Sequence, residues 1–252
     1  MNNIEYRLFF VYPFKLELFL EPNEYDWRID AEGLSYNLFQ SRPMYISVIS
    51  FEQQKQRRYT AKRLKTRFNQ THLYSNMQYF YKDEFGYYFN KLFKKSQLLE
   101  DEIARNMALI GTDYISLTFR FQQLLGDFKE TGFPTLSKSE QRNLIERCLQ
   151  CIETLHENNK ECILVTSDSS TFLQEAAKRF SYVYIITGNV VHMDYVETND
   201  AVDLQTHLKS FVDFFMIANA KSVNLAMVNP LYQSYFPLMA SLVYRKPYHI
   251  IC

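Results

Sequence analysis

The strongest constraint in this sequence is a regular alternation of strand-like and helix-like segments from residue 114 to residue 252. Short apolar runs rich in β-branched and aromatic residues predict strands at 114–119, 161–166, 182–187, 222–227 and 247–252. Helical periodicity predicts helices at 137–158, 169–180, 203–220 and 233–244. Such alternation is typical of a parallel sheet with helices on both faces. We therefore expect an α/β fold with a Rossmann-like domain at 111–252.

The helix predicted at 137–158 has a clear start signal. Ser137 is followed three residues later by Glu140, which is the spacing of a capping box.

Residues 1–110 show no comparable series, and we expect them to form a smaller, mainly helical or mixed N-terminal region. Residues 51–69 carry seven Lys and Arg side chains. A helix with this charge is either a solvated face or a surface for an acidic or phosphate-bearing ligand. Residues 74–93 are dense in aromatic side chains, which predicts a core between packed helices.

The charge and glycine content exclude two common ways of binding nucleotides or nucleic acids. Lys plus Arg and Asp plus Glu both number 28, so the formal net charge is zero and no overall basic field attracts nucleic acid. The chain has six glycines, and neither the G-x-G-x-x-G nor the Walker pattern occurs. Nucleotide binding would need another device.

The four cysteines are Cys148, Cys151, Cys162 and Cys252. Cys148 and Cys151 have C-x-x-C spacing but fall in a predicted helix with no second ligand pair, so we expect two buried helix cysteines rather than a zinc site. No signal peptide is visible, and no apolar run reaches the roughly 18 residues of a membrane span. The sequence predicts a cytoplasmic protein with reduced thiols.

Candidate binding groups follow the predicted parallel strands, whose carboxyl ends share one edge of the sheet. Arg120 comes directly after the strand at 114–119, and its planar guanidinium suits a diphosphate. The alternative is an arginine that leaves the sheet and reaches water. After the next strand, Asp168 or Ser169 could cap the following helix, or the free amides there could hold a ligand.

Two further loops carry candidates. His192 could act as a general base, although it has no identified orienting partner and a structural role is the alternative. Ser234 precedes the helix predicted at 233–244, where a hydroxyl and free amides could hold an anion.

Together these segments resemble the GDP-fucose-using fucosyltransferases, a superfamily that includes the α-1,2, NodZ-like and protein O-fucosyltransferase groups. The matching segments are a strand ending at Arg120, then Val165-Thr-Ser-Asp168, residues 211–218, and Ser234-Tyr-Phe236 before Met239. The resemblance covers about 113–252. It implies a GT-B type fold. Either the amino-terminal acceptor domain of that fold is reduced here to residues 1–110, or the chain is a shortened version of a longer ancestor.

The resemblance also implies roles for individual residues. The family's H-x-R-x-G-D type motif gives an arginine to the diphosphate, which is the place of Arg120. Thr118 stands where the family has histidine, Phe121 where a second arginine is frequent, and Gly126-Asp127 comes several residues late.

The remaining implied contacts lie in three other segments. The family's S-x-F element, which meets the phosphates, is matched by Ser234, Tyr235 and Phe236. The nucleoside or sugar side is matched by Ser167, Asp168 and Ser169. Asp213 matches an acidic residue of the preceding helix, with either a structural role in positioning the loop or a ligand contact.

The function implied is inverting transfer of a sugar, with fucose expected, from a nucleotide diphosphate sugar to a glycan acceptor. No D-x-D triplet follows a strand, so we expect a metal-independent reaction without a cofactor, in which Arg120 and His192 serve catalysis. The alternative is a non-catalytic nucleotide-sugar or interaction protein with an incomplete site. A hydrolase is disfavoured because G-x-S-x-G is absent.

Overall fold

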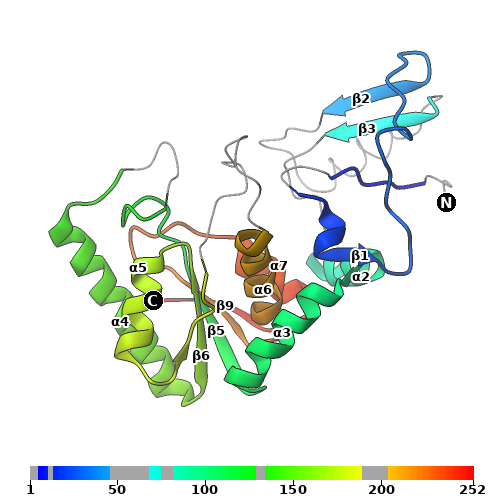
Figure 1. The fold of residues 1–252 in the computed structure, drawn as a ribbon. Helices are drawn as coiled ribbons and strands as arrows, with labels where there is room; N and C mark the ends of the chain where they lie inside the picture. Colours follow the sequence, from blue (N-terminus) through cyan, green and yellow to red (C-terminus); the bar gives the residue numbers. More distant parts are fainter. Residues whose placement is uncertain (1–4, 11–13, 46–67, 75–81, 129–133, 189–203) are drawn as a thin grey trace.

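The computed structural model describes residues 5–10, 14–45, 68–74, 82–128, 134–188 and 204–252. Its centre is a five-stranded parallel sheet with the strand order β7-β6-β5-β8-β9 (Figure 1). The strands are β5 (Tyr114–Phe119), β6 (Cys162–Ser167), β7 (Val183–Tyr184), β8 (Val223–Ala226) and β9 (Tyr248–Ile251). The helices around it are α3 (Gln97–Ile110), α4 (Lys138–Asn159), α5 (Ser170–Arg179), α6 (Leu204–Asn219) and α7 (Phe236–Val243).

The alternation read from the sequence is confirmed, and two element ends differ from the prediction by more than one residue. β7 is only two residues long, because only Val183 and Tyr184 pair with β6. α7 begins at Phe236, three residues later than predicted. Pro237 lies in its first turn, where a proline fits without losing a helical hydrogen bond.

Both faces of the sheet are covered. Every residue of β5 is buried, and successive side chains of a strand point to opposite faces. Tyr114 faces α6, and its hydroxyl donates to the carbonyl of Met216 at 2.7 Å. Ile115 and Leu117 face the other way, into a core that includes residues of α4 and α5. Figure 1 shows α4 and α5 on one side of the sheet and α3, α6 and α7 on the other.

The capping box predicted at the start of α4 is present. The Ser137 hydroxyl accepts the amide of Glu140, and the Glu140 carboxylate accepts the amide of Ser137 at 2.9 Å. None of the described helices, α4 included, is both long and apolar enough to cross a membrane.

The described part of residues 1–110 is mixed in structure. It contains the 3-10 helix η1 (Leu16–Leu18) and the helices α2 (Lys82–Leu92) and α3. It also contains two small sheets: β1 (Leu20–Pro22) pairs antiparallel with β4 (Phe93–Lys95), and β2 (Ser41–Tyr45) pairs parallel with β3 (Gln70–Tyr74). A parallel pair requires a crossover connection, so β2 and β3 have the strand direction of an α/β unit.

The N-terminal segments share one hydrophobic core with the large sheet. Phe14, Phe19 and Trp27 are buried in the same cluster as residues of α3 and α6. The ring of Phe19 stacks on Phe211 of α6 with centroids 4.5 Å apart. The two parts thus bury apolar surface against each other, and a domain boundary at residue 110 stays a prediction.

The aromatic-rich segment around α2 is only partly core. Phe85, Phe89 and Phe93 pack against the buried cluster, as predicted. Tyr87 and Tyr88 of the same helix are more than half exposed. The prediction of a basic helix at 51–69 falls almost entirely outside the described residues.

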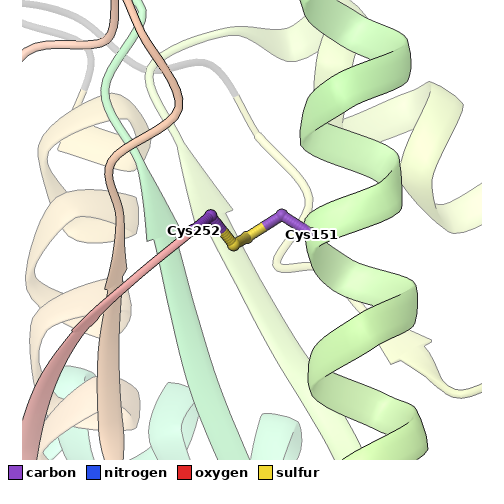
Figure 2. Close-up of a disulfide and its surroundings, with 2 residues drawn as sticks. All are labelled: Cys151 and Cys252. Carbon is purple, nitrogen blue, oxygen red and sulfur yellow. A yellow bond between two sulfur atoms is a disulfide. The ribbon is translucent and has the colours of Figure 1, made fainter.

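The expectation of reduced cysteines is wrong for two of them. Cys151 of α4 and Cys252 after β9 form a disulfide, with Cα atoms 6.1 Å apart (Figure 2). The two positions are 101 residues apart in sequence and meet only when β9 has joined the sheet beneath α4. Cys148 is a buried free thiol, as predicted, and Cys162 is free and partly buried.

Helices α2 and α7 approach closely at Gly86. A Cβ atom added to Gly86 would overlap the carbonyl oxygen of Leu242 and lie 2.8 Å from that of Val243. Asn90, one turn later on α2, donates to the same Val243 carbonyl at 2.9 Å. The absence of a side chain at Gly86 therefore sets the distance between these helices.

We expect Gly86→Ala to lower the free energy of unfolding by about 1–3 kcal/mol, because the methyl group must push α2 away from α7. In an exposed helix the same change would stabilise by up to about 1 kcal/mol. Urea denaturation measures the difference. The control Tyr87→Ala, at an exposed position of α2, should stay within about 0.5 kcal/mol of the parent. Unchanged stability of Gly86→Ala would contradict the close contact.

Candidate functional site

Three loops meet at the edge where β5, β6 and β8 end. The loop after β5 begins with Arg120, and its carbonyl accepts the amide of Tyr232 from the loop between β8 and α7 at 3.1 Å. Asp168, directly after β6, binds the backbone of the loop after β5. The structure thus brings Arg120 and Asp168 together and places the segment carrying Ser234 beside them.

The side chain of Arg120 is held on two sides. Its Nη1 lies 3.2 Å from Asp168 Oδ2, and its guanidinium carbon lies 4.8 Å from the centre of the Phe128 ring. About a fifth of the side chain is exposed. An ion pair and a cation–π contact fix the guanidinium while leaving part of it accessible. A preorganised cation therefore lies at the carboxyl edge of the sheet.

Asp168 orders the backbone around Arg120. Its Oδ1 accepts the amide of Phe121 at 2.8 Å, and its Oδ2 accepts the amide of Gln122 at 2.7 Å. Gln122 has a φ of 55°, an unusual value for a residue with a side chain, so these bonds stabilise a strained turn. Burial raises the pKa of Asp168, while Arg120 and the two amides oppose that rise.

Both carboxylate oxygens of Asp168 are therefore used to position Arg120 and the turn after it. The contact with a nucleoside or sugar that the resemblance implies for Asp168 stays a prediction.

The capping role considered for the loop after β6 is confirmed for Ser169. Its hydroxyl accepts the amide of Phe172 at 3.1 Å and caps α5. Ser167 accepts the amide of Ser169 at 3.0 Å and lies against Asp168. Both serines are buried. Their hydroxyl groups are thus engaged in the local backbone, and a ligand role for them stays a prediction.

Asp127 is a site residue to which the sequence reasoning gave little weight. Its Oδ2 accepts the amide of Thr171 and the hydroxyl of Ser169, each at 2.8 Å. A carboxylate is favourable at this place because the start of a helix carries partial positive charge. The protein's own carboxylate therefore occupies the anion position at the start of α5. The Gly126-Asp127 pair in the sequence was the available signal for this residue. The sequence did not show that Asp127 binds the start of α5.

The start of α7 is more open. The Ser234 hydroxyl accepts the amide of Phe236 at 3.2 Å, and Tyr235 is more than half exposed. The Phe236 ring packs against Phe214 of α6, with centroids 5.5 Å apart. Pro237 has no amide hydrogen, so this helix start offers one donor fewer than an ordinary one.

Asp213 forms a buried ion pair that the sequence did not predict. Its Oδ2 lies 2.6 Å from Lys209 Nζ, one turn earlier on α6, and both side chains are more than nine-tenths buried. Asp213 Oδ1 has no hydrogen-bond partner among the described residues. Burial raises the pKa of Asp213, and the Lys209 ammonium opposes the rise. An i, i+4 Lys–Asp spacing on an otherwise apolar helix face was the signal for this pair.

The position where the family has histidine is filled differently. Thr118 points toward β6, and its hydroxyl oxygen lies 2.8 Å from that of Thr166 in the buried interior of the sheet. His192, the other candidate for proton transfer, lies outside the described residues. Within the described segments, no group of three or more His, Cys, Asp or Glu side chains is arranged to hold a metal ion.

We expect Lys209→Met to lower the free energy of unfolding by about 3–5 kcal/mol, because it leaves the buried carboxylate of Asp213 without a counterion. The double variant Lys209→Met/Asp213→Leu should recover most of that loss. Chemical denaturation measures both. As a control, Arg179→Met breaks an exposed ion pair with Glu146 and should cost less than about 1 kcal/mol. Equal effects of the buried and exposed changes would contradict the buried charge.

No protein-family model matches the chain, and no curated protein matches its sequence. Solved structures do match. The NodZ α-1,6-fucosyltransferase soaked with GDP-fucose aligns with a TM-score of 0.55 and 11% identity, over 90% of this chain and 75% of that one. NodZ from Bradyrhizobium aligns with a TM-score of 0.54 and 11% identity, over 90% and 76% of the two chains.

A mutant of FUT1 from Arabidopsis thaliana, solved in complex with GDP, aligns with a TM-score of 0.53 and 9% identity. That match covers 92% of this chain and 60% of the plant protein. The alignments therefore extend well beyond residues 113–252, to which the sequence resemblance was limited. The chain has the GT-B-like fold of these fucosyltransferase structures.

Proposed function

We propose that this protein is a glycosyltransferase that transfers a sugar, with fucose expected, from a nucleotide diphosphate sugar to a glycan acceptor. The observation that carries the proposal is the guanidinium of Arg120, fixed by Asp168 at the carboxyl edge of the sheet beside the loop of Ser234. The fold adds support, because the similar structures are fucosyltransferases solved with GDP-fucose or GDP.

The chemistry needs a cation where negative charge develops on the departing diphosphate. The Arg120 guanidinium would donate to phosphate oxygens, and the Ser234 hydroxyl would supply another donor at the start of α7. Because Asp168 already orders the turn, the guanidinium needs little rearrangement when the donor binds. The reaction as proposed breaks the bond between the anomeric carbon and the phosphate oxygen and inverts that carbon.

The acceptor hydroxyl attacks the anomeric carbon and gives its proton to a general base. We assign that base to His192 as a proposal, since Thr118 and Thr166 bind each other at the position of the family's histidine. The region 1–110 would hold the glycan acceptor as a reduced acceptor domain. Its parallel strands β2 and β3 support that assignment, because they have the strand direction of an α/β unit.

A second function is a non-catalytic protein that binds a nucleotide sugar. The Thr118–Thr166 pair favours this second function. Thr118 stands where the family has histidine, and its hydroxyl does not titrate near neutral pH as an imidazole does. Binding of GDP-fucose without transfer to any offered glycan, in a protein that also fails to hydrolyse the donor, would select this function over the enzyme.

We also propose the cytoplasmic location expected from the sequence. The cytoplasm is reducing, and protein disulfides there are usually transient. In that location the Cys151–Cys252 bond would form and break rather than persist. Trapping thiols in intact cells before fractionation measures both the location and the fraction of the bond formed.

We expect Arg120→Ala to weaken GDP-fucose binding by about 10- to 100-fold, the usual effect of losing a charge-assisted hydrogen bond. Arg120→Lys keeps the positive charge beside Asp168 but loses the fork, so its affinity should fall between those of the parent and the alanine variant. Isothermal titration calorimetry measures the affinities, and a thermal melt of each variant checks that it is folded.

Arg105→Ala is the matched control for this experiment. Arg105 is an exposed arginine of α3 paired with Glu102 on the surface. Its removal should leave GDP-fucose affinity unchanged. If Arg120→Ala binds as tightly as Arg105→Ala, Arg120 does not hold the diphosphate.

A further inference from the structure

Both ends of the Cys151–Cys252 disulfide are attached to the loop between β8 and α7. On the strand side, the carbonyl of Ile251, next to Cys252, accepts the amide of Met227 at 2.9 Å. On the helix side, Arg147 lies one turn before Cys151 on α4, and its Nη2 donates to the carbonyl of Asn229 at 2.6 Å. The disulfide therefore cross-links the two elements that hold the first residues of this loop (Figure 2).

The same loop continues into the candidate donor site. The amide of Tyr232 donates to the carbonyl of Arg120, and Ser234 two residues later accepts the amide that begins α7. Leu231, which precedes Tyr232 in this loop, is buried in the core beside α4 and α5. A shift of α4 relative to β9 would thus be passed along one continuous set of contacts from the disulfide to Arg120.

The disulfide is open to reagents from solution. A cavity of about 320 Å³ adjoins it, lined by both cysteines, by the end of β9 and by polar and apolar side chains of α4: Arg147, Gln150, Thr154, Leu155, Asn158 and Ile251. Cys252 is exposed, whereas Cys151 is buried. An incoming thiolate would therefore attack the sulfur of Cys252.

The neighbouring free thiol does not compete for this bond. Cys148 lies one turn before Cys151 on α4 and is fully buried. Burial raises the pKa of Cys148 to about 12, so almost none of it is thiolate near neutral pH. The disulfide can open and close again between the same two partners.

We propose that the Cys151–Cys252 disulfide is a redox-sensitive latch that orders the loop between β8 and α7 and thereby controls donor binding. The control of donor binding rests on the proposed function, whereas the ordering of the loop does not. In the reaction, one thiolate of a dithiol bonds to Cys252 Sγ, and Cys151 leaves as a thiolate that takes up a proton. The second thiol of the reductant then releases Cys252 as a thiol, and the reductant is oxidised to its disulfide.

Hydrogen exchange read by mass spectrometry tests the latch directly. We expect the amides of residues 227–235 to exchange about 5-fold faster or more after treatment with dithiothreitol, because α4 and β9 then hold the loop independently. Peptides from β5 and β6 serve as internal references and should not change. Equal exchange in the oxidised and reduced protein, or the absence of a Cys151–Cys252 bond in protein purified without reductant, overturns the proposal.

Two variants separate the latch from a general effect of the reductant. Cys151→Ser/Cys252→Ser should exchange like the reduced protein and no longer respond to dithiothreitol. Cys148→Ser keeps the disulfide and should respond like the parent. A thermal melt establishes that each variant is still folded at the temperature of the exchange experiment. If the double serine variant still responds to dithiothreitol, the latch is not this disulfide.

A binding experiment tests the consequence for the donor site. We expect GDP to bind about 5-fold more weakly to the reduced protein, at the small end of coupling between distant sites. Equal GDP affinity in both redox forms overturns the control of donor binding. If neither form binds GDP, the proposed function fails and takes the control of donor binding with it, while the exchange experiment still decides whether the disulfide orders the loop.

Discussion

The carboxylate of Asp168 is the interaction on which the candidate site depends. It is buried at the end of β6, and it binds two backbone amides and a guanidinium from the end of β5. Burial alone would disfavour its charge, so these three donors are what make a carboxylate acceptable there. In return, the carboxylate fixes the turn at Gln122 and the direction of Arg120. The neighbouring strands are joined by their backbone ladder, and the Asp168 side chain continues that connection beyond their ends.

The other loops at this edge of the sheet are also connected by hydrogen bonds from one loop to the backbone of another. Asp127 binds the start of α5, Arg147 binds the loop after β8, and the carbonyl of Arg120 accepts an amide from that loop. A chain with six glycines and no glycine-rich phosphate loop thus organises its loop backbone with carboxylates and arginines. Each of these hydrogen bonds joins segments far apart in sequence, so a displacement of one loop would displace the loop bonded to it.

Local chemistry explains which features could be predicted from the sequence. The strand at 114–119 was predicted to the residue because burial is favourable for an uncharged run rich in apolar residues, and the start of α4 was predicted from its capping box. Arg120 was found because it ends that run. The Lys209–Asp213 pair and the role of Asp127 were missed, since a charge on a helix or loop is commonly solvated and burial depends on what packs against it.

The sequence by itself determined the order of strands and helices along the chain, the parallel direction of the sheet and the edge at which the candidate site lies. Those properties follow from hydrophobic periodicity and turn residues, which act over short distances along the chain. Only the tertiary structure decided which groups at that edge touch. The ion pair of Arg120 with Asp168 spans two strands, and the bond between Cys151 and Cys252 spans 101 residues. Contacts over such separations depend on the register and packing of the finished sheet.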